Sequence, residues 1–261
     1  KSLKEALLHG GLAHGLETKV RWIEAEDIKR ETSAEQLAAC DGILVPGGFG
    51  LRGIDGMVEA IRYARENQVP YFGICLGMQT MVIEFLRNVC GIPEAHSTEF
   101  DPKARHRAFL KLRELKGIED LGGTMRLGAW PCRLVPGSVA ERAYGQSEIS
   151  ERHRHRFEFN RPEYESVITE HGLCISGETP ELQYVEICEL PSHPWYLGCQ
   201  FHPEFKSKPL APQPLFKSFV GASYKRRTER GQTAAEAEAA RFLRPRSRSV
   251  GPTLRWAEPD A

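Results

Sequence analysis

One cysteine stands between two glycines, where an apolar run gives way to a helical pattern. Apolar residues 70–72 lead into residues 73–79, G-I-C-L-G-M-Q, and residues 78–89 then keep helical spacing. A sharp strand-to-helix turn of this kind presents one side chain above the end of a sheet, and glycines tolerate its strained backbone. The amino end of the helix favours negative charge on the sulfur. The pattern therefore predicts Cys75 as a nucleophile.

A histidine and a carboxylate follow another apolar run. Residues 196–200 lead directly into residues 201–205, F-H-P-E-F. In an extended chain, residues two apart lie on the same side, so His202 and Glu204 can act as a base and the carboxylate that orients it. A half-exposed histidine and a surface glutamate at a strand exit remain the alternative for this motif alone.

Two glycines end a third apolar run, in residues 45–50, V-P-G-G-F-G. Backbone N–H groups at these glycines could hydrogen-bond a developing oxyanion, as could the N–H of Leu76. A simple tight turn is the alternative, and the segment lacks the Lys-Ser/Thr of a phosphate loop. Because ligands bind at the carboxyl ends of parallel strands, we expect the three motifs to converge.

Together the three motifs resemble those of the class I (triad) glutamine amidotransferases. Three further segments are similar, more narrowly, to the glutaminase domains of the CTP synthase family: residues 97–102 (S-T-E-F-D-P), 122–128 (G-G-T-M-R-L-G) and 151–158 (E-R-H-R-H-R-F-E). The resemblance covers about residues 3–227 and includes every position of the triad.

The resemblance implies that Cys75 attacks the side-chain amide of glutamine and forms a γ-glutamyl thioester. His202 would then protonate the leaving ammonia and activate water, and Glu204 would hold the imidazole in its productive tautomer. Backbone N–H groups of Gly48 and Leu76 would stabilise the tetrahedral oxyanion.

The resemblance also implies how glutamine is recognised. Glu99 would face its α-ammonium and Arg156 its α-carboxylate, although Arg152 and Arg154 remain alternatives for the second role. His153 and His155 alone are too few ligands for a metal site, so we expect none. The implied glutamine-binding residues are Gly48, Leu76, Gly77, Met78, Gln79, Glu99 and Arg156.

Complete members of the CTP synthase family carry an amino-terminal amidoligase domain that binds ATP, Mg²⁺ and UTP and aminates UTP with ammonia. This sequence has no phosphate loop for that chemistry. The resemblance implies that the chain hydrolyses glutamine but does not make CTP alone. Its ammonia would travel through a tunnel to an amidoligase domain, on the same or a separate polypeptide, in a homotetrameric complete enzyme. GTP would act as an allosteric activator, and Phe49 and residues 125–128 resemble neighbours of the GTP-responsive lid.

Short β-rich runs alternate with amphipathic segments, which indicates an α/β fold. With the resemblance, the expected fold is class I glutamine amidotransferase-like (flavodoxin-like), with a mainly parallel sheet, helices on both faces and additional strands. The expected domains are a glutaminase domain over residues 1–227, with a last helix at 212–226, and a flexible polar tail over 228–261, in which a short helix could form near 234–243. The expected strands are residues 19–23, 42–46, 70–74, 107–112, 132–135, 156–159, 173–176, 184–190 and 196–201.

The 35 basic and 35 acidic side chains cancel, so overall charge favours neither nucleic acid nor membrane as a partner. Seven cysteines without a C-x-x-C pair indicate a reducing compartment, and no apolar leader is present, so a cytoplasmic location is expected. The sequence begins with Lys1, and residues 2–8 already have a helical pattern, which suggests a piece of a longer polypeptide.

Several alternatives remain open. The chain could be the glutaminase domain of another amidotransferase, or a hydrolase that uses Cys75 on an ester or lactone. It could also be a non-catalytic, glutaminase-like regulatory module, although the complete set of Cys75, His202 and Glu204 argues against that. The arginines after residue 240 could bind nucleic acid, but prolines and acidic residues dilute them and favour a solvated tail.

Overall fold

The structure, a computed structural model, describes residues 1–111, 125–181 and 184–243, with side chains up to residue 232. Contacts within the chain divide it into a first unit, Lys1–Arg226, and a second unit, Arg227–Ala261. All the residues expected at the candidate site belong to the first unit. None of the helices in the described ranges has the length and the apolar content needed to cross a membrane.

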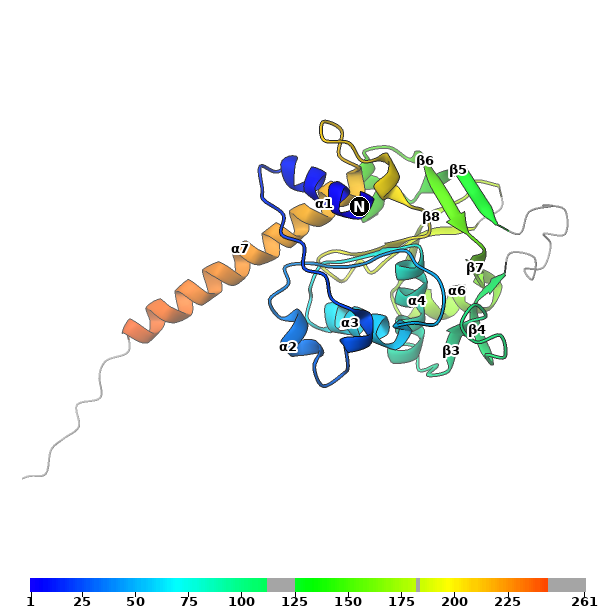
Figure 1. The fold of residues 1–261 in the computed structure, drawn as a ribbon, viewed down its shortest axis with the longest axis horizontal. Helices are drawn as coiled ribbons and strands as arrows, with labels where there is room; N and C mark the ends of the chain where they lie inside the picture. The colour runs from blue at the N-terminus through cyan, green and yellow to red at the C-terminus, as the bar shows by residue number, and fades with distance from the viewer. Residues whose placement is uncertain (112–124, 182–183, 244–261) are drawn as a thin grey trace, which may run out of the picture. The chain divides into compact units, whose positions relative to one another are not determined.

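Two sheets form the framework of the first unit (Figure 1). In the larger one, β1, β2 and β10 pair in parallel, whereas β9, β8, β5 and β6 continue it with antiparallel pairs in that order. The smaller sheet has the order β3-β4-β7. The strands are β1 Ile43–Val45, β2 Tyr71–Ile74, β3 Ala95–Ser97, β4 His106–Lys111, β5 Arg126–Leu134, β6 Glu148–His155, β7 Phe157–Phe159, β8 Cys174–Glu178, β9 Val185–Glu189 and β10 Tyr196–Cys199.

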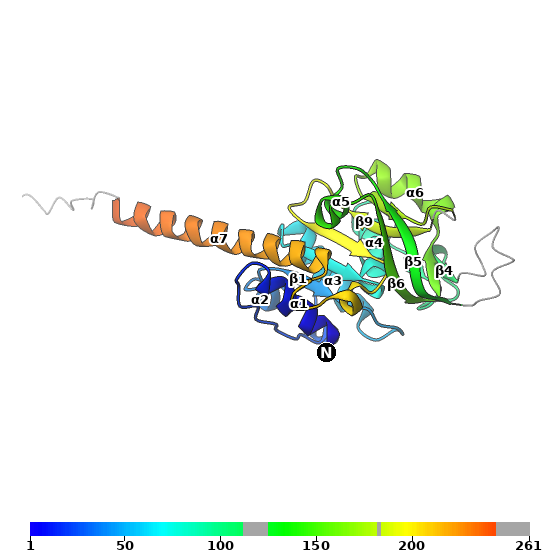
Figure 2. The same ribbon diagram turned by 90° about the horizontal axis from the view of Figure 1, so that it is seen from above.

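Helices cover both faces of the larger sheet (Figures 1 and 2), because successive strand residues point to opposite sides. Tyr71 of β2 joins the core that includes α3, α4 and α6, whereas the next residue, Phe72, joins the core with α1, α5 and α7. Phe72 lies 5.2 Å from the ring of Phe216. The helices are α1 Ser2–Leu12, α2 Ser33–Leu37, α3 Ile54–Glu66, α4 Leu76–Asn88, α5 Val139–Tyr144, α6 Arg161–Glu170 and α7 Pro214–Leu243, with short 3₁₀ turns at η1 Ala25–Asp27 and η3 Pro203–Lys206.

The expected α/β fold with helices on both faces is confirmed, and the sheet as a whole is mixed. Its parallel part is β1-β2-β10, and the additional strands are antiparallel because short connections join β8 to β9 and β9 to β10. The strand expected at 19–23 is wrong: this segment pairs with no described strand, and Trp22 is 67% exposed. The other expected strands overlap with β1, β2, β4, β5, β7, β8, β9 and β10, and the structure adds β3 and β6.

The last helix is longer than the sequence pattern predicted. We expected a helix over 212–226 and a flexible tail from residue 228 with a separate short helix near 234–243, but α7 continues without a break to Leu243. The added residues are mostly Ala, Glu, Arg and Gln, which favour helix, and the first proline after the helix begins is Pro245. The rest of the expected tail, residues 244–261, lies outside the described residues.

A tight strand-to-helix turn connects β2 to α4 through Cys75. Its backbone has φ +52° and ψ −101°, a conformation that is strained for a residue with a side chain. The backbone N–H of Cys75 donates to the carbonyl of Cys199 at the end of β10, over 2.7 Å. A Cβ on Gly77 would lie 2.1 Å from the Val45 carbonyl oxygen, and one on Gly73 would lie 2.7 Å from the Gly77 carbonyl. Both glycines therefore allow the turn to pack directly against neighbouring backbone.

We predict that Gly77→Ala lowers the free energy of unfolding by about 1–3 kcal/mol, the usual cost of overpacking. The clash is with the backbone of Val45, which cannot rotate away as a flexible side chain could. Gly231→Ala is the matched control, because open space surrounds this glycine in α7 and alanine favours helix by up to about 1 kcal/mol. Chemical denaturation of both variants checks the prediction, and equal stability of Gly77→Ala and the parent protein would contradict it.

Candidate active site

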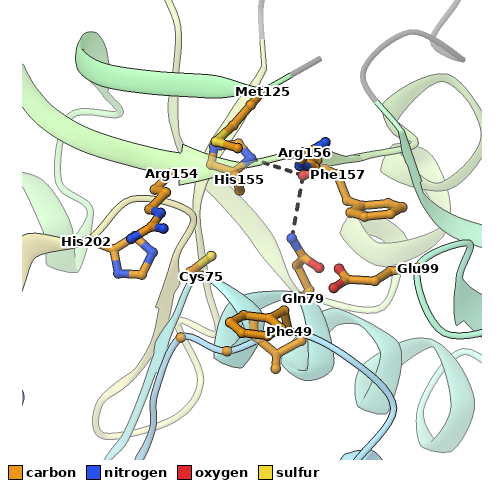
Figure 3. Close-up of a pocket in the computed structure, with 13 residues that line it drawn as sticks. Phe49, Cys75, Gln79, Glu99, Met125, Arg154, His155, Arg156, Phe157 and His202 are labelled. Carbon is orange, nitrogen blue, oxygen red and sulfur yellow. Dashed lines mark hydrogen bonds between the residues drawn. The ribbon is translucent and has the colours of Figure 1, made fainter.

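A cavity of about 420 Å³ lies where the carboxyl ends of β1 and β2 meet the amino end of α4 (Figure 3). Segments far apart in the sequence form its wall: the loop after β1, the turn before α4, the segment after β3, the end of β6 with the start of β7, and the segment after β10. The lining residues are Gly47, Gly48, Phe49, Cys75, Leu76, Gln79, Glu99, Met125, Arg154, His155, Arg156, Phe157 and His202.

Two of the three expected catalytic side chains, Cys75 and His202, line this cavity, and Glu204 lies beside His202. Nδ1 of His202 lies 2.9 Å from Oε1 of Glu204, and because a carboxylate only accepts, Nδ1 carries the hydrogen. The other ring nitrogen is then available for Cys75, which lines the same cavity. Burial disfavours the imidazolium, but the hydrogen bonds and charges of Cys75 and Glu204 outweigh it and raise the pKa of His202 to about 10. At neutral pH the His202 ring is therefore protonated and can act as an acid.

The glycines after β1 bring the backbone close to this triad. A Cβ on Gly47 would lie 2.6 Å from Cε1 of His202, so only glycine fits there without moving the ring. Gly48 lies beside Leu76, because a Cβ on Gly48 would lie 3.1 Å from Cδ2 of that residue. The N–H of Leu76 belongs to the first turn of α4 and has no acceptor within the helix. Two backbone donors thus stand at the wall of the cavity.

The other expected binding residues divide into two groups. Gln79 and Glu99 line the cavity. Glu99 is half-buried and accepts from the N–H of Gly50 over 3.3 Å; burial raises the pKa of its carboxyl group. Gly77 and Met78 are not among the lining residues, since Gly77 packs on β1 and Met78 packs in the core beneath β10. Helical geometry explains the division, because successive side chains of α4 point about 100° apart.

The alternating motif at residues 151–158 lies on β6 and β7, with its arginines exposed and its histidines buried. Arg154 and Arg156 line the cavity, and Arg152 does not. The structure therefore leaves two candidates, rather than three, for an arginine that binds a carboxylate. His155 also lines the cavity, which the sequence did not predict, because two-residue alternation would place it on the face of the strand opposite Arg154 and Arg156.

Behind the cavity wall lies a buried ionic cluster that the sequence analysis also missed. Arg126, only 2% exposed, lies 3.1 Å from Glu158 and 2.5 Å from Glu186. His153 and His155 share a hydrogen bond of 2.9 Å, and Nε2 of His153 lies 3.5 Å from Oε2 of Glu186.

Arg126 belongs to the segment 122–128 that carried the resemblance, of which residues 122–124 lie outside the described residues. Among the described residues, no group of three or more His, Cys, Asp or Glu is arranged to hold a metal ion.

The cluster favours bound protons. Burial raises the pKa of Glu186 to about 7 and that of Glu158 to about 8, although the positive charge of Arg126 opposes both shifts. Burial also lowers the pKa values of His153 and His155, so both rings are neutral near pH 7. A proton on Oε2 of Glu186 would give that oxygen and Nε2 of His153 the hydrogen-bond partner that both otherwise lack.

A family profile and curated sequence relatives match most of this chain. The family profile described as "Glutamine amidotransferase class-I" matches residues 1–222. The CTP synthase of Acidobacterium capsulatum is 66% identical over 239 residues, which are 90% of this chain and 43% of the relative. The CTP synthase of Koribacter versatilis is 63% identical over 249 residues, which are 94% of this chain and 44% of the relative. The chain thus spans less than half the length of these curated relatives.

Solved structures agree with the sequence relatives. The glutaminase domain of Trypanosoma brucei CTPS, solved with bound acivicin, matches with a TM-score of 0.80 and 37% identity, over 86% of this chain and 87% of that one. A Thermoplasma acidophilum protein, assigned to one of the subunits of GMP synthase, matches with a TM-score of 0.53 and 18% identity, over 87% and 90% of the two chains. The second match shows a shared fold alone.

We predict that the buried cluster makes the protein less stable as the pH rises. The pKa of Glu186 is about 7 in the folded state, against about 4.3 for an unperturbed glutamate. The stabilisation that Glu186 gives by retaining its proton is therefore complete below pH ~4.3 and is lost as the pH rises through the folded pKa. Over this range the free energy of unfolding falls by up to about 1.4 kcal/mol per pH unit. Glu186→Gln imitates the protonated form, so its stability relative to the parent protein should increase from pH 5 to pH 8.

Denaturation curves measured at several pH values check this prediction. Glu170→Gln, an exposed glutamate in α6, is the control and should leave the pH dependence of the parent protein unchanged. If Glu186→Gln and Glu170→Gln have the same pH dependence, Glu186 does not retain a proton in the folded protein.

Proposed function

Because this chain belongs to the class I glutamine amidotransferase family, we propose that it hydrolyses the side-chain amide of glutamine with Cys75, His202 and Glu204. One observation carries the proposal: Cys75 and His202 line the same cavity, and Nδ1 of His202 lies 2.9 Å from Oε1 of Glu204. This is the arrangement of an activated nucleophile, with a proton-transfer group that a third residue orients. The triad positions and the family therefore support the same reaction.

In the first half of this reaction, Sγ of Cys75 attacks the amide carbon of glutamine, and the C=O electron pair moves to the oxygen. Backbone N–H groups of Gly48 and Leu76 donate to that oxyanion, and such a donor is worth about 10²–10³ in rate. The tetrahedral intermediate then collapses, the C–N bond breaks, and His202 gives its proton to the departing nitrogen. Ammonia leaves, and a γ-glutamyl thioester remains on Cys75.

In the second half, the neutral His202 ring removes a proton from water, and the resulting hydroxide attacks the thioester carbon. The C–S bond breaks, glutamate leaves, and the sulfur and the imidazolium return to their starting states. Glu204 keeps Nδ1 of His202 protonated throughout, so that the other ring nitrogen faces the reacting atoms in both halves.

Charged groups around the cavity suit the amino-acid end of glutamine. Glu99 offers a carboxylate to the α-ammonium group, and Arg154 or Arg156 offers a guanidinium fork to the α-carboxylate. Gln79 lines the cavity, and its buried side-chain oxygen accepts no hydrogen bond from the described residues. Recognition of both charged groups would distinguish glutamine from simpler amides, esters and lactones.

We also propose that the ammonia serves the amination of UTP to CTP. The relatives with 63–66% identity are named CTP synthases, whereas the GMP synthase match is 18% identical and supports only the fold. An amidoligase domain on the same or a separate chain would bind ATP, Mg²⁺ and UTP and receive ammonia through a tunnel. The complete enzyme would be a cytoplasmic homotetramer. GTP would activate it, and two lining residues, Phe49, which is 90% exposed, and Met125, belong to the segments that resemble neighbours of the GTP-responsive lid.

Glutamate release from glutamine tests the proposed reaction. We expect the chain to release glutamate, Cys75→Ala to abolish the release, and His202→Ala to lower it by about 10²–10⁴, the usual contribution of general acid–base catalysis. Cys174→Ser is the matched control, because this thiol on β8 is not a lining residue and its loss should have no effect. Release that is absent at every glutamine concentration, with and without GTP, would count against the proposal and favour a non-catalytic module.

Alanine substitutions on β6 and its end test glutamine recognition. The arginine that binds the α-carboxylate should raise KM by about 10-fold or more when it is replaced, the usual cost of losing a hydrogen bond to a charged group. We therefore expect a large effect from Arg154→Ala or Arg156→Ala and none from Arg152→Ala, which removes an exposed arginine outside the cavity. Equal KM increases in all three variants would indicate a general effect of charge rather than a specific contact.

A further inference from the structure

We propose that Gln200 positions the sulfur of Cys75 and stabilises its negative charge. This inference rests on the proposed function of Cys75 as a nucleophile. Gln200 is fully buried, and its Nε2 lies 3.7 Å from Sγ of Cys75, within range of an N–H···S hydrogen bond. It follows β10 directly and stands two residues before His202. It is not among the lining residues of the cavity, so it acts through Cys75 and not on the substrate.

The orientation of the Gln200 amide is fixed by its other neighbour. Its Oε1 lies 3.3 Å from Nε2 of Gln79, which also donates to the backbone carbonyl of Phe157 over 3.5 Å. A carbonyl can only accept, so the NH₂ group of Gln79 must point this way. Exchanging O and N in Gln200 would then place two NH₂ groups against each other. The NH₂ group of Gln200 therefore faces the sulfur.

The same chain of hydrogen bonds continues into the buried cluster. Nδ1 of His155 donates to the Phe157 carbonyl over 3.1 Å, and the other nitrogen of His155 lies 2.9 Å from His153. His153 in turn lies against Glu186, which is paired with Arg126. Hydrogen bonds of fixed direction thus connect the cavity wall to His153, which lies 3.5 Å from Glu186 of the buried ion pair, and they limit rotation of the side chains between them.

The backbone of Gln200 is held as firmly as its side chain. Its N–H donates to the Glu186 carbonyl over 2.8 Å, and the carbonyl of the preceding Cys199 accepts from the N–H of Cys75. The sulfur and the amide that faces it are therefore fixed to neighbouring strands of one sheet. A donor held in place before the reaction stabilises charge without reorganising during it.

Gln200 differs from His202 in one useful respect: its amide is neutral at every working pH. His202 gains and loses a proton during the proposed reaction, whereas Gln200 donates to the sulfur throughout. Its loss should therefore reduce the reactivity of Cys75 and lower kcat, but leave KM for glutamine nearly unchanged. A residue that only supported the fold would change thermal stability without this selective effect.

Alkylation of Cys75 by iodoacetamide tests the proposal without requiring glutamine turnover. The modified peptide is quantified by mass spectrometry between pH 6 and pH 10 in the full chain. Gln200→Met removes the amide at similar length, and we expect alkylation at pH 7 to slow about 10-fold, the usual effect of losing a hydrogen bond to a charged acceptor. Gln200→Glu places a carboxylate beside the sulfur, and we expect a larger loss and a pH profile displaced to higher pH.

Gln213→Met is the matched control, because Gln213 is also a buried glutamine, with hydrogen bonds to Tyr144 and Glu151 away from Cys75. It should leave the alkylation profile unchanged even if it lowers the melting temperature. Profiles of Gln200→Met and Gln200→Glu that coincide with that of the parent protein would overturn the proposal, as would an equal displacement in Gln213→Met. If Gln200→Glu does not fold, the uncharged Gln200→Met decides the question.

The same experiment separates this proposal from the proposed function. A parent protein that reacts rapidly with iodoacetamide at Cys75 but releases no glutamate would contradict glutamine hydrolysis and leave the role of Gln200 measurable. Normal glutamate release together with unchanged alkylation of the Gln200 variants would contradict only the positioning role.

Discussion

The rest of the site depends on the strained backbone of Cys75. With φ at +52°, this residue turns the chain from β2 into α4 within a single position, a conformation that costs about 1–3 kcal/mol in a residue with a side chain. Surrounding contacts maintain it: the backbone of Gly77 lies against β1, and the Cys75 N–H is bound to β10. Strain of this kind persists only where many contacts determine it, and here it places a sulfur at the end of the sheet.

Parallel pairing of β1, β2 and β10 then determines which residues meet that sulfur. The three strands run in one direction, so the segments that follow them leave the sheet at the same edge. These segments carry Gly47, Cys75 and His202, and Gly47 is so close to the imidazole that a side chain at this position would displace it. The arginines proposed to bind the substrate carboxylate, Arg154 and Arg156, lie at the end of β6 and directly after it. The parallel strands therefore position the proposed catalytic groups, and β6 contributes the arginines proposed for recognition.

How much of this could be predicted from the sequence depends on whether a feature is local. The turn at Cys75 and the catalytic motif at residues 201–205 follow from short patterns of apolar residues and glycines, and the structure brings them together. Partners that meet only after folding were not predictable: nothing near Arg126 in the sequence indicates that it is buried between Glu158 and Glu186. For the same reason, the pattern at 19–23 resembled a strand but found no neighbouring strand with which to pair.

The central claim is that glutamine is hydrolysed through an acyl group on Cys75, and hydroxylamine tests it most directly. A thioester reacts with hydroxylamine to give γ-glutamyl hydroxamate in competition with water. We predict that glutamine and hydroxylamine give hydroxamate at the expense of glutamate, and that Cys75→Ala gives neither product. Glutamate release without any hydroxamate, at concentrations of hydroxylamine that leave the protein folded, would contradict the account, because water would then attack the amide without a covalent intermediate.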